Sequence, residues 1–291
     1  MKKLLLLGLV LSVMIGVACE KVETPVVEGT FSFMVGEFEV IMLVEAEREG
    51  NSAILVDADE EVLSRFIPAE GFLHTANAFL VKANGLNILI DAGTGVDGIL
   101  VEKIKALGIQ PEEINAVLIT HLHFDHFGGL LLDGQAAFPN AEVYLSVQEY
   151  EYFIVTNPNQ RAVDALAPYS LQIVTFAPAE LNAEQKTPLF SGITPIAAFG
   201  HTPGHTVFQI ENNGEKLLII GDLLHVALVQ FAIPEISATF DIDPVEAAQT
   251  RRQILTYAAE NQISVGGMHI VYPGIGTVEV DGEGFKLTAM N

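Results

Sequence analysis

The chain has 291 residues, and half of them are hydrophobic, which is enough to bury one large core or two small ones. It is strongly acidic, with 14 Lys and Arg against 37 Asp and Glu and a formal net charge of −23. Because a surface of this charge repels phosphate backbones, the composition argues against nucleic acid as a partner.

The first 19 residues differ from the rest. Lys2 and Lys3 precede an apolar run over residues 4–18, and Cys19 follows directly. A basic start, an apolar middle and small residues before a cleavage point are typical of a secretory signal. The alternative is a membrane-spanning helix, but the apolar run is short for that. The segment therefore predicts export.

Cys19 is the only cysteine of the chain and stands where cleavage would occur. The stretch resembles the lipobox of bacterial lipoproteins, although Gly16 occupies a position where an aliphatic residue is usual. We therefore expect a lipoprotein that is periplasmic or anchored to the outer membrane, with an ordinary cleaved signal as the alternative. Only acyl chains at Cys19 would attach it to a membrane, since this acidic chain offers no basic patch. Residues 20–30 are interpreted as a short tether.

Strand-like runs dominate the remaining chain, with alternating apolar residues and many β-branched ones. The predicted strands cover residues 38–46, 52–58, 77–83, 86–93, 115–120, 171–177, 193–200, 206–211, 216–222 and 263–270. Asn84-Gly85 and Asn213-Gly214 have the composition of tight hairpin turns.

Two helices are predicted, over residues 97–109 and 243–261. The second has the clearer signals, with Asp243 as N-cap, Pro244 in the first turn and apolar residues three and four apart. Each half of the chain thus has strands followed by a helix. This order predicts two sheets face to face with helices outside, in one α/β domain over residues 31–291.

The segment THLHFDHFGGL, residues 120–130, gathers three of the eight histidines of the chain. His121 and His123 are two residues apart, so in extended backbone they project to the same side. Asp125 and His126 follow where the chain turns. Imidazole and carboxylate together are ligands that zinc prefers. The spacing therefore indicates a metal site.

Four ligands on one short segment cannot all surround a single tetrahedral ion, so two ions that share the segment fit better. Each ion then needs further ligands, and the sequence offers them at predicted strand ends: His201 and His205 in GHTPGHT, Asp222, and His269. Because a carboxylate can bridge two metals and an imidazole normally cannot, Asp222 is the natural bridge.

HLHFDH has the H-x-H-x-D-H pattern of the metallo-β-lactamase superfamily, and GHTPGH, GD and a final His follow in that family's order. The resemblance implies a four-layer αβ/βα sandwich with two zinc ions at one edge of the paired sheets. It assigns His205 to a structural position. It implies that one ion is held by His121, His123 and His201, the other by Asp125, His126 and His269, and that Asp222 joins them.

GDLLHVALVQF (221–231), FDIDP (240–244) and HIVYPGIG (269–276) look like the methyl parathion hydrolase branch, which includes secreted organophosphate hydrolases and enzymes with lactonase activity. The resemblance implies a metal-bridging hydroxide that attacks a neutral ester, either a lactone of the acyl-homoserine type or an organophosphate triester. Asp125 and Asp222 would be the catalytic carboxylates. Acyl-homoserine lactonases tend to carry a tyrosine three residues after the bridging aspartate, where this chain has His225.

Phe124, Phe127 and His225 stand next to the predicted ligands and are candidates for the substrate pocket. Other aromatic residues, such as Phe240, are expected in the core. Asp91 is expected to fix a turn or to orient a ligand rather than to hold metal. The resemblance also allows a homodimer.

Other functions stay open. The chain could be another hydrolase of the same fold, although a true β-lactamase would be expected to lack Asp222, and a glutathione thioesterase would need more basic residues. It could also be a zinc-binding lipoprotein without catalytic activity. Hydrolysis of a chromogenic lactone or aryl phosphotriester, lost on chelation, separates these alternatives.

Overall fold

The computed structural model describes residues 25–290. The predicted signal peptide with Cys19, and the tether up to residue 24, lie outside this range. At the end of the predicted tether, Val27 packs against the core and Thr30 begins the first strand. Among the described residues, no helix has the length and apolar character needed to cross a membrane.

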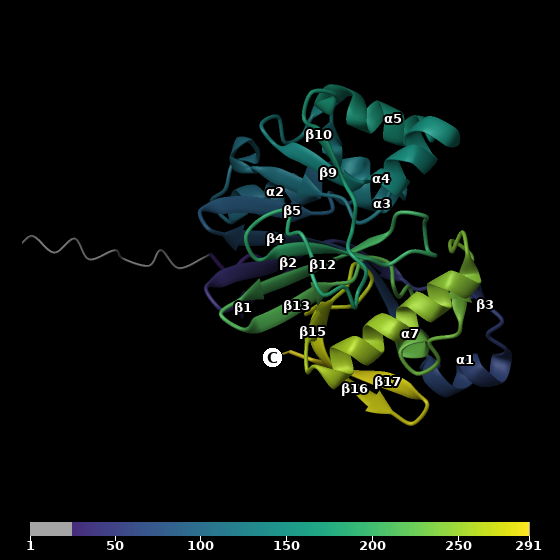
Figure 1. Cartoon of the computed structure of the whole chain (residues 1–291). Helices are drawn as coiled ribbons and strands as arrows, with labels where there is room; N and C mark the ends of the chain where they lie inside the picture. Colours follow the sequence, from purple (N-terminus) through teal and green to yellow (C-terminus); the bar gives the residue numbers. More distant parts are fainter. Residues whose placement is uncertain (1–24, 291) are drawn as a thin grey trace, which may run out of the picture.

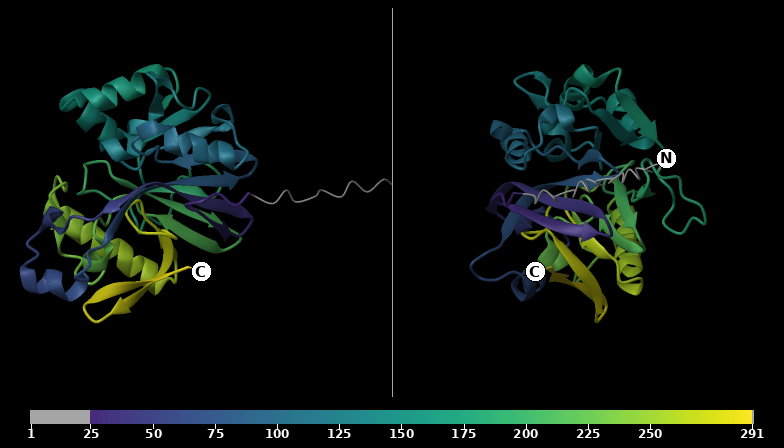
Figure 2. Two further views of the ribbon diagram at one scale, coloured as in Figure 1. Left: turned by 180° about the vertical axis from the view of Figure 1, so that it is seen from behind. Right: turned by 90° about the vertical axis from the view of Figure 1, so that its left-hand side faces the viewer.

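Two sheets lie face to face, with helices on both outer sides, which confirms the expected four-layer αβ/βα sandwich (Figure 1). The same layers are visible from behind in Figure 2. The first sheet has the spatial order β1 (Thr30–Val35), β2 (Phe38–Glu49), β4 (Leu73–Ala83), β5 (Leu86–Ile90), β6 (Ala116–Leu118), β9 (Glu142–Ser146) and β10 (Ile173–Phe176). The second has the order β11 (Ile193–Ala197), β12 (Thr206–Asn212), β13 (Glu215–Ile219), β15 (Ser264–Gly266), β16 (Ile275–Asp281) and β17 (Gly284–Ala289).

Smaller elements complete the fold. Two short strand pairs join β14 (Ser237–Ala238) to β3 (Leu55–Val56) and β7 (Leu131–Leu132) to β8 (Gln135–Ala136). The α-helices are α1 (Glu60–Phe66), α2 (Ile99–Ala106), α3 (Phe124–Phe127), α4 (Val147–Tyr150), α5 (Gln160–Leu166), α6 (Ala227–Gln230) and α7 (Pro244–Glu260). A π-helical segment, Glu151–Thr156, continues α4.

The alternation of side chains along β4 shows how the layers are held together. Phe79 and Val81 belong to the core between the two sheets, whereas Ala78 and Leu80 belong to the core beneath the outer helices. Successive side chains of a strand point to opposite faces, so the segment of β4 that is covered on both faces, residues 78–81, is apolar throughout. This explains why the pattern alone identifies β4 as a buried strand.

Each outer layer has its own core. Helices α2 and α5 pack on the first sheet, and α7 packs on the second through Ile254 and Leu255. The start of α7 has the expected capping, because the Asp243 side chain accepts hydrogen bonds from the backbone N–H groups of Val245 and Glu246. Both asparagine-glycine turns also adopt the expected left-handed backbone, with φ of 53° at Asn84 and 84° at Gly214.

Some predicted strand boundaries are wrong. Residues 52–54 form a 3₁₀ turn, and only Leu55–Val56 pair as a strand. The strand predicted over 86–93 ends at Ile90, because Asp91 has a φ of 59° and turns the chain. The strand predicted over 263–270 ends at Gly266, so His269 lies in the following loop.

Candidate metal centre

Four loops that follow strands carry the predicted ligands. The segment with His121 and His123 follows β6, and His201 follows β11. Asp222 comes after β13, and His269 comes after β15. The structure therefore brings ligands from both sheets to one place.

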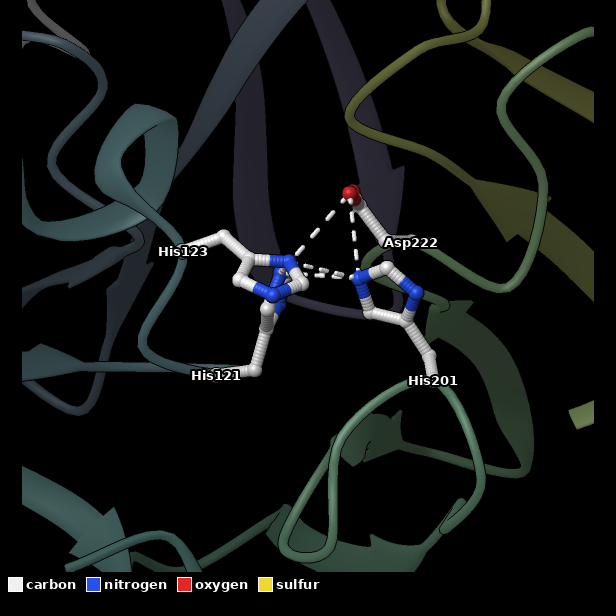
Figure 3. A group of neighbouring side chains, drawn as sticks. All are labelled: His121, His123, His201 and Asp222. Atoms are coloured by element: carbon white, nitrogen blue, oxygen red, sulfur yellow. Dashed lines mark hydrogen bonds and ion pairs between the residues drawn. The ribbon is translucent and has the colours of Figure 1, made fainter. Parts of the chain in front are cut away.

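The first group consists of His121, His123, His201 and Asp222, whose ligand atoms all lie within 4.8 Å of one another (Figure 3). Nε2 of His201 is 2.9 Å from Nδ1 of His123 and 3.1 Å from Nε2 of His121. Figure 3 shows the three rings directed at one another and at the carboxylate of Asp222.

Outward hydrogen bonds fix the orientation of these rings. Nδ1 of His201 donates to Oδ1 of Asp241 at 2.8 Å. Nδ1 of His121 lies 3.1 Å from the hydroxyl of Thr120, which itself donates to Oδ2 of Asp91. His121 and His201 therefore carry their proton on Nδ1 and direct the lone pair of Nε2 inward. Inward lone pairs at such short separations repel one another unless a cation lies between them.

The second group consists of Asp125, His126, His269 and the same Asp222. Nδ1 of His126 is 2.6 Å from Oδ2 of Asp91, and Nδ1 of His269 donates to the backbone carbonyl of Thr75 at 2.7 Å. Nε2 is again the inward atom of both rings. Asp222 belongs to both groups, which is the arrangement that a bridging ligand requires.

Two buried polar atoms at the junction of the groups, Oδ1 of Asp222 and Nε2 of His126, lie 3.1 Å apart but have no partner in hydrogen-bond geometry. An unpaired buried polar atom costs about 1–3 kcal/mol, so such atoms are rare without a ligand or an ion. The donor set, its nitrogen and carboxylate chemistry, and these unpaired atoms all fit a pair of divalent cations.

The electrostatics of the first ligand group agree with this interpretation. Burial lowers the pKa of His201 to about 3 and holds that of His121 well below its ordinary value, so both rings are neutral at pH 7 and able to bind metal. Burial opposes the ionisation of Asp222, but His126, His269 and His121 outweigh it and hold the pKa well below its usual range. Burial also opposes protonation of His126, but the nearby carboxylates, Asp222 first, raise its pKa well above its ordinary value. Without metal this ring therefore holds a proton at pH 7, which a bound cation would displace.

His205 does not face the two groups. Its Nδ1 donates to the carbonyl of Ala198, and its Nε2 accepts the backbone N–H of Asp222, both at 3.0 Å. Both ring nitrogens are thus used, and the ring holds the loop of the bridging aspartate in place. This placement agrees with the structural role that the resemblance implies.

Two carboxylates that support the site have no assigned role in the sequence interpretation. Asp241 orients His201, and the buried Glu149 joins two ligand loops. Glu149 accepts hydrogen bonds from the N–H of Leu122 at 2.7 Å, the hydroxyl of Thr202 at 2.8 Å and the N–H of Gly204 at 2.9 Å. Asp241 stands in the quoted FDIDP motif, which could have signalled it, whereas Glu149 lies on α4 with no ligand near it in sequence.

A cavity of about 700 Å³, called the reaction cavity below, opens next to both groups. It is lined by candidate ligands, including His123, Asp125, Asp222 and His269, and by other residues, including Arg48, Glu49, His74, Phe124, His225 and Phe240. Phe124 and His225 thus lie in the wall of the cavity. Phe240 also lies in this wall and is 51% exposed, so it is not a core residue.

Phe127 does not line this cavity, and its assignment to the substrate pocket is wrong. Its side chain is 0% exposed and belongs to the core between the first sheet and the outer helices. Phe124 and Phe127 are three positions apart on the short helix α3, so their side chains are neighbours, but only Phe124 reaches the cavity. Phe124 remains at the surface while the ring of Phe127 packs against it from below, with ring centroids 5.8 Å apart.

A sequence model of the metallo-beta-lactamase superfamily matches residues 71–261, which include six of the seven candidate ligands and both loops joined by Glu149. The chain belongs to this superfamily. His269 is the one candidate ligand outside the matched residues, and the fold brings it to the other ligands.

Among curated relatives in the superfamily are an N-acyl homoserine lactonase of a Bacillus species, 29% identical over 42% of this chain, and the N-acyl homoserine lactonase AttM of Agrobacterium fabrum, 29% identical over 57%. These matches span 43% and 61% of the relatives' own lengths.

Solved structures resemble the chain over more of its length. The hydrolase AbOPH superposes with a TM-score of 0.80 and 29% identity, over 92% of this chain and 99% of its own. AidC, a dizinc quorum-quenching lactonase, superposes with a TM-score of 0.79 and 24% identity, over 90% of this chain and 99% of its own. At this level of identity, the similarity to AidC shows a shared fold and nothing about activity.

Proposed function

We propose that this protein is a dinuclear zinc hydrolase of neutral esters, with lactones of the acyl-homoserine type as the first candidate substrates. The observation that carries the proposal is the sharing of Asp222 by two complete ligand groups at the wall of an open cavity. The lactonase activity of the curated relatives supports the choice of substrate, although each match covers only part of those proteins.

Two bound zinc ions would supply hydroxide at neutral pH and polarise the oxygen of the ester under attack. The residues of the chain would hold these ions and transfer a proton during the reaction. Burial opposes the ionisation of Asp125, but His126 outweighs it and lowers the pKa, so the carboxylate is ionised at pH 7. About a third of its side chain remains accessible. Asp125 can therefore take up a proton at a carboxylate oxygen and return it to the leaving alcohol.

The charge around the reaction cavity favours a neutral substrate. Its wall contains the carboxylates of Glu49, Asp125 and Asp222, with Arg48 as the cationic residue. Phe124 and Phe240 add aromatic surface that suits an apolar substituent. On a chain with a net charge of −23, multiply charged anions would be repelled before they reached the site.

Aryl phosphotriesters are the second candidate substrates. His225 is the observation that favours them, because a tyrosine is usual three residues after the bridging aspartate in acyl-homoserine lactonases. The downstream motifs that resemble the methyl parathion hydrolase branch point the same way.

The test is a parallel assay of an N-acyl homoserine lactone and an aryl phosphotriester with zinc-loaded protein. We expect hydrolysis of at least one, complete loss on chelation and recovery when zinc is returned. Equal rates with and without metal would refute the mechanism. A protein that binds zinc tightly and hydrolyses neither substrate would favour the non-catalytic lipoprotein.

Export and lipid attachment at Cys19 are also proposals, supported by the N-terminal sequence alone. In a bacterial host, metabolic labelling with an alkyne fatty acid should mark the wild-type chain and not Cys19→Ser. Equal labelling of both chains would rule out a lipid at this position.

A further inference from the structure

Arg251, on α7, is a buried cation that the proposed mechanism does not use. Its side chain is 1% exposed, and by volume it is the largest fully buried side chain among the described residues. Burying a charge is strongly unfavourable unless the group is paired and hydrogen-bonded. The contacts of its N–H groups therefore indicate what this cation does in the fold.

The Arg251 guanidinium contacts one segment of the chain near both of its ends. This segment, residues 222–241, is called the 222–241 segment below. Nε of Arg251 donates to the backbone carbonyl of Leu223, and Nη2 reaches Oδ2 of Asp241 at 3.5 Å. Because Arg251 lies on a 17-residue helix that packs on the second sheet, it offers a fixed point to both ends.

Nη1 of Arg251 holds the middle of the same segment. It donates to the backbone carbonyls of Pro234 at 2.7 Å and Ile236 at 3.0 Å. The side chain of Gln230 donates to the carbonyl of Ile236 as well, at 2.9 Å, and accepts the backbone N–H of His225 at 2.7 Å. Arg251 and Gln230 thus form one continuous set of hydrogen bonds over the 222–241 segment.

Both ends of this segment reach the candidate metal centre. Leu223 directly follows Asp222, which belongs to both ligand groups. Asp241 accepts a hydrogen bond from Nδ1 of His201 at 2.8 Å, and Figure 3 shows His201 directed at Asp222. One guanidinium therefore connects the backbone beside the shared carboxylate with the group that orients a histidine ligand.

We propose that Arg251 is a positioning residue of the metal centre, which holds Asp222 and His201 in their binding arrangement before metal arrives. The inference rests on the proposed function and extends it to a residue outside the ligand set. Ligands that are held in advance lose less conformational entropy on binding, so metal binds more tightly. A lysine keeps the charge but has a single nitrogen, and it cannot replace a planar fork with four acceptors around it.

The first test measures zinc affinity in Arg251→Lys by competition with a chromogenic chelator. Both ions should bind roughly 10–100-fold more weakly, because the shared Asp222 belongs to both groups. Arg252→Lys is the matched control at the next position of α7. Arg252 forms an ion pair with Glu235 and its side chain is 40% exposed, so this variant should keep wild-type affinity for both ions.

Cobalt in place of zinc separates positioning from general stabilisation. The visible absorption of Co²⁺ depends on the geometry of its ligands, so the spectrum of Arg251→Lys should differ from those of wild type and Arg252→Lys. If Arg251 only stabilised the fold, Arg251→Lys would unfold at a lower urea concentration but keep the wild-type cobalt spectrum and zinc affinity. That result would overturn the inference.

A second measurement, on the wild-type chain, decides the case in which Arg251→Lys does not fold. Coupling between two sites is reciprocal, so zinc must strengthen the hydrogen bonds of Arg251 if Arg251 strengthens zinc binding. The chain has five arginines, and single substitutions of the other four assign their Nε–H signals in NMR spectra. Zinc should slow hydrogen exchange at Nε of Arg251 at least about tenfold, the lower limit of the change in zinc affinity, and leave Arg252 unchanged. An equal response of both arginines would contradict the proposal.

The outcomes separate this inference from the proposed function. If the wild type binds two zinc ions and hydrolyses an ester while Arg251→Lys keeps the same affinities, the inference fails and the proposed function stands. If Arg251→Lys weakens the binding of both ions and no ester is hydrolysed by the wild type, the inference is supported and the proposed hydrolase activity fails. A wild-type chain that binds no zinc refutes both.

Discussion

At the scale of single residues, the ligands follow from the sequence and their supports mostly do not. The H-x-H-x-D-H spacing identifies His121 to His126 because neighbours in sequence are neighbours in space there. Asp91 was also expected to orient a ligand, and it contacts His126. Asp241 and the backbone carbonyl of Thr75 reach their histidines only through the fold. The FDIDP motif could have signalled Asp241, but no local pattern says which distant histidine such a residue contacts.

Asp241→Ala tests whether the outward hydrogen bonds matter. The variant frees Nδ1 of His201 and removes a carboxylate 3.5 Å from the buried Arg251, so we expect zinc to bind the first ligand group roughly 10–100-fold more weakly. Competition with a chromogenic chelator measures this affinity.

Asp243→Ala is the matched control, because it removes a carboxylate two residues away that only caps α7. It should cost about 1 kcal/mol of stability and leave zinc affinity unchanged. Equal zinc affinity in Asp241→Ala and Asp243→Ala would show that the orientation of His201 does not limit metal binding.

At the scale of elements, long and strongly patterned segments are predictable and loops are not. The strands β2 and β4 and the helix α7 match the predicted segments within a few residues, because their burial repeats along the chain. The predicted strand over residues 52–58 fails, since only two of its residues find a partner strand. Glu149 joins two ligand loops through hydrogen bonds, and it lies on α4. This helix has only four residues, so no periodicity in the sequence could reveal it.

Glu149→Gln should change how stability depends on pH. Burial raises the pKa of Glu149 to about 7, although its carboxylate accepts three hydrogen bonds. A carboxyl group whose pKa is raised by folding holds its proton more tightly in the folded state. Its favourable contribution is therefore complete below the unfolded pKa and is lost as the pH rises through about 7.

Urea denaturation of the metal-free wild type and Glu149→Gln at pH 5 and pH 8 measures this effect. The wild type should gain about 2–3 kcal/mol relative to the variant at the lower pH. A difference between the two proteins that stays constant from pH 5 to pH 8 would contradict the role assigned to burial.

Gly221→Ala should disturb the loop of the bridging aspartate. Gly221 has a φ of 55°, and an added Cβ would lie 2.5 Å from Nε2 of His205, the atom that holds the backbone of Asp222. We expect a loss of about 1–3 kcal/mol together with loss of metal. Gly214→Ala is the control, since Gly214 has a φ of 84° but open space around the added Cβ. It should lose stability and keep its metal, and an equal metal content in both variants would refute the argument.

At the scale of the whole molecule, the fold could be predicted from two independent patterns. Alternating burial indicates face-to-face sheets, and the order of the metal-ligand motifs is that of the metallo-β-lactamase superfamily. The shape of the reaction cavity could not be predicted. Its wall includes loops whose positions depend on packing against distant parts of the chain.

The acidic charge acts at the same scale. A net charge of −23 disfavours anionic ligands over the whole surface, and the candidate metal centre is the place where added cations would reverse the sign locally. The central claim at this scale is that loops of both sheets hold two divalent ions through a shared Asp222.

Zinc content tests that claim most directly. The purified chain, stripped of metal and titrated with zinc, should take up two ions per molecule by elemental analysis, and Asp222→Ala should take up fewer and lose its hydrolytic activity in parallel. A folded wild-type chain that takes up no zinc, or an Asp222→Ala variant that keeps two ions and normal turnover, would contradict the account.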